Sequence, residues 1–205
     1  MTGTFVTFEG GDAAGKTTQA EALTDWLIAE GHEVVRTREP GGTTLGMGVR
    51  DLVLHRDEPV DPRAEALLYA ADRAQHVAHV VRPALGRGAV VVQDRYLDSS
   101  VAYQGVGRAI DADVVRRLSL WAADGLLPDV TILLDLDPAA ARARRTGRVF
   151  DRLEAEHDAF HERVREAFLR LAADEPARFV VLDAARPADE LHAPIRDAVL
   201  ARVTR

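Results

Sequence analysis

The stretch that decides the fold lies close to the N-terminus, where residues 10–17 read GGDAAGKT. It fits the pattern G-x-x-x-x-G-K-[ST], and it lies between a β-branched run at residues 4–9 and an amphipathic segment that begins at Lys16. Glycines at these spacings let successive backbone N–H groups turn inward as an anion nest, and a helix that starts at Lys16 adds its positive end. This context predicts a phosphate-binding loop rather than a chance glycine turn.

The loop assigns specific roles to its residues. Lys16 is expected to reach the β and γ phosphates of ATP, and the Thr17 hydroxyl is expected to ligate Mg²⁺. No N-K-x-D, T-K-x-D or L-S-G-G-Q segment follows in the sequence, which argues against a GTPase switch or a transporter ATPase. The residues predicted to bind ATP here are Gly10, Gly11, Asp12, Ala13, Ala14, Gly15, Lys16, Thr17 and Thr18.

Outward from the loop, short apolar runs alternate with helical segments. Strands are predicted at residues 4–9, 89–93, 130–136 and 179–182, with a weaker one at 33–37. Helices are predicted at residues 16–30, 61–85, 111–123, 138–145, 151–173 and 187–203, and the glycine-rich residues 39–48 are expected to be irregular. The alternation predicts an α/β P-loop NTPase fold, with a five-stranded parallel sheet and helices on both faces, in a single domain over residues 1–205.

Composition narrows the class of protein. The 33 acidic residues outnumber the 26 basic ones and give a formal net charge of -7, which argues against a nucleic-acid or anionic-membrane partner. There is no cysteine, and no run approaches the roughly 20 apolar residues of a membrane span. A cytoplasmic protein is therefore expected, with any anionic ligand held by local basic residues.

A second candidate site segment, DRYLDSSVAYQG at residues 94–105, follows the predicted strand at 89–93. Ligands of α/β sheets bind beyond the carboxyl ends of the strands, so this segment should face the phosphate loop. Asp94 is expected to organise Mg²⁺ and its waters, and Arg95 to offer a fork of donors to phosphate. An isolated Asp-Arg pair would be interpreted as a surface ion pair. Its position next to the phosphate loop favours a role in binding phosphate and Mg²⁺ instead.

Five segments together resemble the thymidylate kinase family, nearly from end to end and in family order. They are FEGGDAAGKTTQ at residues 8–19, TREPGGT at 37–43, LLYAADRAQHV at 67–77, QDRYLDSSVAYQG at 93–105 and DRLE at 151–154. The resemblance implies ATP-dependent phosphorylation of dTMP to dTDP with Mg²⁺ as cofactor, and a homodimer. The alternatives are a kinase for another nucleoside monophosphate or a deoxynucleoside, and a non-enzymatic nucleotide-dependent switch.

The resemblance also implies which residues bind the acceptor. Asp12 matches a carboxylate that accepts a hydrogen bond from the 3′-hydroxyl, Arg38 matches the arginine that meets the acceptor phosphate, and Arg95 serves both phosphate and acceptor. At the base, the resemblance implies that Tyr69 stacks on thymine, that Arg73 donates to the base O4, and that Ser99 and Ser100 orient the base. At the sugar, it implies that Tyr103 packs against C2′. Gln104 matches a residue that lines the sugar and base.

The basic segment RARRTGRVFDR, at residues 142–152, contains five arginines in an acidic protein. Such a run is usually a solvated face, but the family carries its lid here, and phosphoryl transfer needs cations around the spreading equatorial charge. Arg148 and Arg152 are therefore predicted to be catalytic, together with Lys16 and Arg95. Arg144 is predicted to lie along ATP, and residues 183–186 are expected to border adenine.

Overall fold

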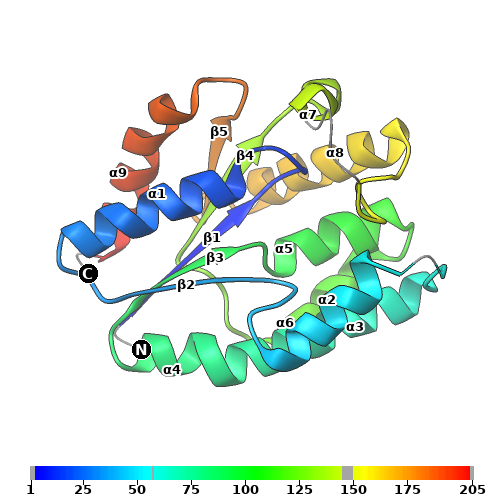
Figure 1. The fold of residues 1–205 in the computed structure, drawn as a ribbon, viewed down its shortest axis with the longest axis horizontal. Coiled ribbons are helices and arrows are strands. Elements are labelled where there is room, and N and C mark those ends of the chain that lie inside the picture. The colour runs from blue at the N-terminus through cyan, green and yellow to red at the C-terminus, as the bar shows by residue number, and fades with distance from the viewer. Residues whose placement is uncertain (1–2, 57, 145–149, 204–205) are drawn as a thin grey trace.

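The structure is a computed structural model that describes residues 3–56, 58–144 and 150–203. Five parallel strands form one sheet in the order β2-β3-β1-β4-β5 (Figure 1). The predicted strands are confirmed, with ends that differ by one residue. Their bounds are β1 Thr4–Glu9, β2 Val34–Arg38, β3 Val90–Asp94, β4 Val130–Asp135 and β5 Phe179–Asp183.

The register of the central strands brings the predicted site segments to one edge of the sheet. Phe8 of β1 and Arg38 of β2 both pair with Asp94 of β3. Because all three strands are parallel, the chain segments that follow them leave the sheet side by side. The phosphate loop, the stretch after Arg38 and the stretch after Asp94 therefore converge on the carboxyl edge.

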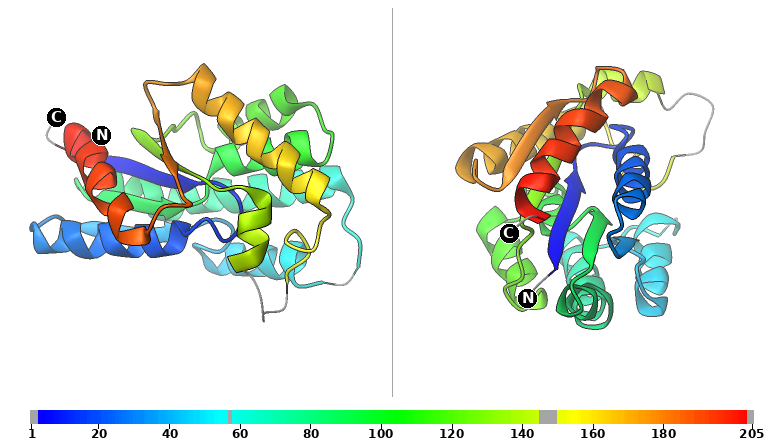
Figure 2. Two further views of the ribbon diagram at one scale, coloured as in Figure 1. Left: turned by 90° about the horizontal axis from the view of Figure 1, so that it is seen from above. Right: turned by 90° about the vertical axis from the view of Figure 1, so that its left-hand side faces the viewer.

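The two faces of the sheet are covered by different helices (Figure 2). On one face, Ile132 and Leu134 of β4 pack into a core with α1 (Lys16–Ala29) and α9 (His192–Val203). On the other face, Leu133 packs with Phe160 and Phe168 of α8 (Asp158–Asp174). This period-two alternation is that of a strand buried on both sides.

The helices within residues 44–122 extend this second layer and the carboxyl edge, whereas Ala141 and Leu191, from two short helices later in the chain, join the first core. α3 begins at Pro62, where the carboxylate of Asp61 accepts hydrogen bonds from two backbone N–H groups, and α6 begins in the same way after Asp111. Their bounds are α2 Thr44–Leu54, α3 Pro62–His76, π-helix η1 Val77–Val81, α4 Arg82–Gly86, α5 Leu97–Ser100, π-helix η2 Val101–Gly107, α6 Ala112–Ala122, α7 Pro138–Arg144 and 3₁₀-helix η3 Ala188–Leu191.

Part of the stretch expected to be irregular is helical. Residues 39–48 were predicted to be a loop, but α2 begins at Thr44, and the Thr43 hydroxyl caps it by accepting a hydrogen bond from the Gly46 backbone N–H at 3.0 Å. Gly46 is needed for packing, since a Cβ there would lie 2.1 Å from Oδ1 of Asp72. The glycine therefore reflects close helix packing and not a helix break.

Two further expectations about helices are corrected. Residues 151–157 were predicted to belong to the following helix but form turns, because Oδ1 of Asp151 accepts hydrogen bonds from the backbone N–H groups of Leu153 and Glu154 at 3.0 and 2.9 Å. The helix predicted at residues 61–85 is divided into α3, η1 and α4. The helical turns of α5 and η2, after Tyr96, were not predicted.

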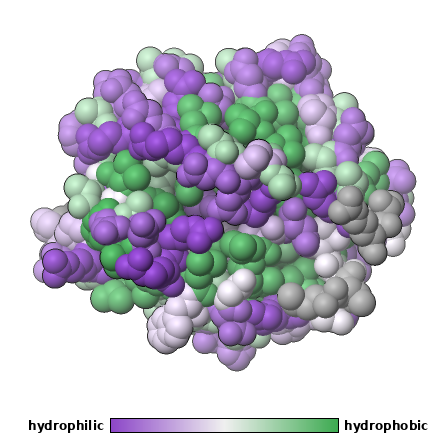
Figure 3. Space-filling view, turned by 180° about the vertical axis from the view of Figure 1, so that it is seen from behind, coloured by the Kyte–Doolittle hydropathy of each residue, from purple (hydrophilic) through white to green (hydrophobic). Residues whose placement is uncertain are grey.

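The surface opposite to the view of Figure 1 mixes apolar and hydrophilic side chains (Figure 3). Within the residues described, no helix combines the length and the apolar character that crossing a membrane requires.

Candidate active site

The phosphate loop adopts a conformation in which glycine is required at its first position. Gly10 has φ +131°, and a Cβ there would lie 2.3 Å from the carbonyl oxygen of Leu134. Ala13 and Gly15 also have positive φ, and α1 begins at the next residue, Lys16. Backbone turns of this kind at a helix N-terminus form an anion-binding concavity.

Lys16 is folded back over this loop. Its Nζ donates to the carbonyl oxygens of Gly10 and Gly11 at 3.2 and 2.7 Å, and only 7% of the residue is exposed. Burial, reinforced by the Arg95 charge, lowers the pKa of Lys16 to about 8, although Asp94 and Asp12 oppose the shift. The ammonium is therefore held beside the loop at a point where phosphate oxygens would stabilise its charge.

The two predicted Mg²⁺ ligands are brought together. The Thr17 hydroxyl donates to Oδ2 of Asp94 at 2.7 Å, and both residues line the cavity. Thr18 is exposed next to them on the first turn of α1. No cluster of three His, Cys, Asp or Glu able to hold a metal occurs in the parts of the chain described. A cation here would therefore take most of its ligands from phosphate and water, as Mg²⁺ does.

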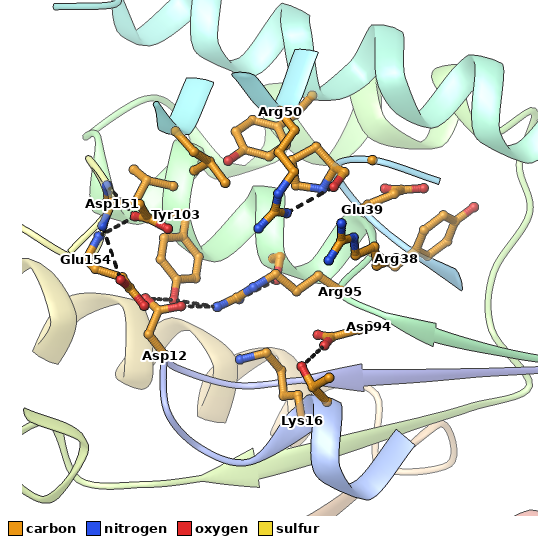
Figure 4. Close-up of a pocket in the computed structure, with 18 of the residues that line it drawn as sticks. Asp12, Lys16, Arg38, Glu39, Arg50, Asp94, Arg95, Tyr103, Asp151 and Glu154 are labelled. Atoms are coloured by element: carbon orange, nitrogen blue, oxygen red, sulfur yellow. Dashed lines mark hydrogen bonds and ion pairs between the residues drawn. The ribbon is translucent and has the colours of Figure 1, made fainter. Parts of the chain in front are cut away.

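Arg95 lies at the centre of the cavity (Figure 4). Its guanidinium donates to the Gly10 carbonyl at 3.1 Å and to the Ser99 hydroxyl at 3.0 Å, and it pairs with Oδ1 of Asp12 at 2.5 Å. Arg95 has φ +66°, a strained conformation for a residue with a side chain. Such strain persists only where surrounding contacts fix the backbone.

Glu9 supplies those contacts. Its buried carboxylate accepts hydrogen bonds from the backbone N–H of Tyr96 at 2.8 Å and from the hydroxyl of Ser99 at 2.5 Å. Burial and the nearby Asp98 carboxylate raise the pKa of Glu9. The last residue of β1 thus fixes the turn that presents Arg95.

Asp12 and Tyr103 complete the centre of the cavity. The Tyr103 hydroxyl donates to Oδ2 of Asp12 at 3.0 Å, and the Arg95 guanidinium lies over the Tyr103 ring. Burial acts to raise the pKa of Asp12, but Arg95, Lys16 and the Tyr103 hydrogen bond outweigh it and lower the pKa to about 2. Asp12 is therefore an ionised hydrogen-bond acceptor at neutral pH.

A second pair of arginines faces the same space from β2 and α2. Arg38, exposed at the end of β2, and Arg50 of α2 both line the cavity, and Arg50 donates to the Pro40 carbonyl at 3.1 Å. Burial and the nearby Arg38 charge lower the pKa of Arg50. Of the carboxylates that the structure describes, none is within ion-pair distance of either guanidinium. Arg50 was not predicted, because it belongs to none of the motifs recognised in the sequence.

Arg73 is 1% exposed and reaches the cavity wall from α3. Its guanidinium donates to the hydroxyls of Ser119 and Ser100, both at 3.1 Å, and pairs with Oε2 of Glu39 at 2.9 Å. Its Nε is buried without a hydrogen-bond partner. Arg73 is therefore held rigidly at the cavity wall by Ser100, Ser119 and Glu39.

The cavity that these residues line has a volume of about 1530 Å³. It is continuous from the phosphate loop to the predicted base-binding residues. Those residues are buried or nearly so and lie together, namely Tyr69, Arg73, Ser99, Ser100, Tyr103 and Gln104.

A profile of the family "Thymidylate kinase" matches residues 8–195, which include all of these positions. The chain belongs to the thymidylate kinase family.

Individual thymidylate kinases are also similar to this chain in sequence and in structure. A thymidylate kinase from Clavibacter michiganensis subsp. michiganensis is 67% identical over 200 residues, covering 96% of this chain and 94% of that protein. One from Cutibacterium acnes is 53% identical over 206 residues, covering 100% of both chains. The crystal structure of thymidylate kinase from Ehrlichia chaffeensis matches with a TM-score of 0.80 and 31% identity, covering 97% of this chain and 99% of that one. The predicted P-loop NTPase fold is thereby confirmed.

The arginines of this thymidylate kinase family member that were assigned to the lid are less free than expected. Arg142 pairs with Asp158, and Arg144 donates to the carbonyls of Ala13 at 3.5 Å and Ala184 at 2.8 Å. Arg152 donates from Nε to the Val53 carbonyl at 2.9 Å and pairs with Glu65. Arg148 lies outside the described residues. Arg144 thus bridges the phosphate loop and the loop expected to border adenine, whereas Arg152 is anchored to Val53 and Glu65.

Proposed function

We propose that this protein transfers the γ-phosphoryl group of ATP to dTMP, forming dTDP and ADP, as one kinase domain over residues 1–205. The observation that carries the proposal is one cavity that joins a phosphate loop to a base-binding end matching the thymidylate kinase family. A non-enzymatic nucleotide-dependent switch would not need the base-binding end of the cavity. A kinase for another nucleoside monophosphate would share the loop but not the base-facing set.

Catalysis is proposed to rest on position and charge. The acceptor is itself a phosphate anion, so no strong general base is needed. Lys16 and the N–H groups of the loop would hold the β and γ phosphates, with Arg144 along ATP. Arg38 and Arg50 would hold the acceptor phosphate, since each has a guanidinium open to the cavity and the two charges repel without an anion. Arg95, between them, would contact the transferred group.

A divalent cation, proposed to be Mg²⁺, fits the pair formed by Thr17 and Asp94. A hydroxyl and a carboxylate are hard oxygen donors, and two protein ligands suit an ion that keeps several waters and phosphate oxygens. When bound, the cation would neutralise charge on the β and γ phosphates.

The lid is proposed to supply further positive charge, with Arg148 and Arg152 as candidates. Arg152 would have to leave Glu65 to meet the transferred phosphoryl.

Acceptor choice tests the function directly. In a coupled ADP assay, dTMP is expected to be the best substrate, dUMP weaker, and UMP, CMP and GMP very poor. Arg73 matches the base O4 as a donor, whereas cytosine presents an amino group there, and Tyr103 leaves no room for a 2′-hydroxyl. Equal turnover of UMP and dTMP, or ADP release that does not depend on a monophosphate, would contradict the proposal.

Two substitutions of Tyr103 distinguish the role of its ring, which fills space, from the role of its hydroxyl, which donates a hydrogen bond. Tyr103→Phe is expected to keep most activity, because Asp12 retains its ion pair with Arg95 and one buried hydrogen bond is worth ~1 kcal/mol. Tyr103→Ala is expected to lose discrimination against UMP, since the ring no longer fills the space at C2′. The measurement is the ratio of kcat/KM for dTMP and UMP. An unchanged ratio in Tyr103→Ala would assign exclusion of the 2′-hydroxyl to another group.

The pH dependence should report Lys16. Its pKa in the free protein is lowered to about 8, so its charge is lost as pH rises through that value. Bound phosphates favour the charged form. We expect kcat/KM for ATP to fall above about pH 8 while kcat at saturating ATP holds to higher pH. Lys16 is the only lysine in the sequence, so side-chain acylation against pH reads its pKa independently. A flat kcat/KM profile up to pH 10 would contradict this assignment.

A cytoplasmic homodimer is proposed for the assembly. α3 and α6 pack together and expose large apolar side chains, namely Leu67, Val114 and Trp121, the last 80% exposed. Paired helices of this kind form dimer interfaces. Light scattering should give a molar mass near twice that of the 22.4 kDa chain, and the mass of a single chain would contradict a dimer.

A further inference from the structure

Glu65 is a charged residue that lies behind the cavity wall. It belongs to α3, on the same face as Tyr69 and Arg73, which line the cavity one and two turns further along. Its side chain is 0% exposed. An ionised group is costly to bury unless it is paired, so a carboxylate at this place needs a reason.

Three donors surround this carboxylate. Nε2 of Gln104 donates to Oε1 at 2.8 Å, Arg108 lies 3.4 Å from both oxygens, and a guanidinium N–H of Arg152 donates to Oε2. Arg108 is in turn paired with Glu156. Two guanidiniums thus hold Glu65 as a carboxylate, and a carboxylate has no hydrogen to donate.

This fixes the direction of the Gln104 amide. Gln104 is 1% exposed and lines the cavity from η2. A glutamine amide can rotate so that its oxygen and its NH₂ exchange places, but only the NH₂ can bind a carboxylate. The amide oxygen of Gln104 is therefore turned away from Glu65, on the side that borders the cavity.

We propose that Glu65 is a positioning residue for base selection: it locks Gln104 so that an acceptor oxygen, and not the NH₂ group, meets the ring N3 of the bound pyrimidine. Thymine and uracil carry a hydrogen at N3, whereas cytosine has a lone pair there. The locked amide suits the first two and opposes the third. The inference rests on the proposed function, because it takes a thymine nucleotide as the acceptor.

The test compares kcat/KM for dTMP, dUMP and dCMP in the wild type, Glu65→Gln and Glu156→Gln, with inhibition constants where turnover is too slow. An amide at position 65 accepts or donates, so Gln104 is free to rotate. In Glu65→Gln the preference for dTMP over dCMP is expected to fall by about tenfold or more. The preference for dTMP over dUMP should stay within about twofold, because both bases present N3–H.

Glu156→Gln is the matched control. It removes the other carboxylate on Arg108 and should leave both ratios within about twofold of the wild type. A folded Glu65→Gln variant with the wild-type preference against dCMP would overturn the proposal. So would an equal change in the dTMP to dUMP ratio, which indicates general damage to the site.

If Glu65→Gln does not fold, Gln104→Ala carries the test. It removes the amide, so the preference against dCMP should fall by about tenfold while the dTMP to dUMP ratio holds. Unchanged discrimination would overturn the proposal, because no amide direction would then matter. Failure of the proposed function would instead appear in the wild type, as poor turnover of dTMP.

Discussion

Lys16→Ala is expected to abolish phosphoryl transfer and to leave the fold intact. The ammonium lies against two carbonyls of the phosphate loop, and its removal leaves the developing charge on the β and γ phosphates unmet, for a loss of ~10³-fold or more in kcat. The side chain packs over loop carbonyls and not in the apolar core, so little stability should be lost. Steady-state kinetics measures the loss of activity, and thermal unfolding checks that the fold is retained.

Arg87→Ala is the control for this result. It also removes one cation, but Arg87 pairs with Glu33 at the opposite edge of the sheet, before β3 begins. It should keep wild-type kcat. If Lys16→Ala kept activity within about tenfold, a cost of only ~1.4 kcal/mol in the barrier, the assignment of the loop would be wrong.

Arg95→Ala is expected to have the second largest effect, a fall of ~10³-fold in kcat. The guanidinium is positioned between the phosphate loop and the acceptor side, and its loss also leaves Asp12 without its ion pair. Alanine keeps the same backbone demand at φ +66°, so the change tests the side chain alone. Arg95→Lys should recover only part of the loss, because an ammonium cannot span Gly10, Ser99 and Asp12 together.

Arg148→Ala shows whether Arg95 acts alone. Ala13 contributes no charge to the phosphate loop, so the lid is expected to supply a further cation. Arg148→Ala should then lower kcat far more than it raises either KM. If Arg148→Ala and Arg152→Ala, singly and together, keep near wild-type kcat, Arg95 supplies that charge by itself.

The sheet and the phosphate loop were predictable because their signals are local. Runs such as VVV at residues 90–92 are β-branched and apolar, and the phosphate-loop pattern predicts a strand before it and a helix after it. The strand ends, which carry Arg38 and Asp94, follow from parallel pairing.

The features that the sequence did not predict correctly depend on contacts that are not visible in a sequence pattern. Gly46 reads as a helix breaker until Asp72 is seen against it, and residues 151–157 read as helix until the Asp151 carboxylate is seen to bind the backbone. Arg50 and Glu65 carry no motif, and their importance arises from the cavity and from α3 packing.

The facing guanidiniums of Arg38 and Arg50 have a consequence for which molecules can enter. Burial lowers the pKa of Arg50, and the nearby Arg38 charge lowers it further, so the two guanidiniums repel each other when no anion lies between them. A free nucleoside such as thymidine would fill the base end while leaving this repulsion in place, whereas its monophosphate relieves it. We therefore expect these two charges to favour phosphorylated acceptors over free nucleosides and uncharged analogues, whichever base the acceptor carries.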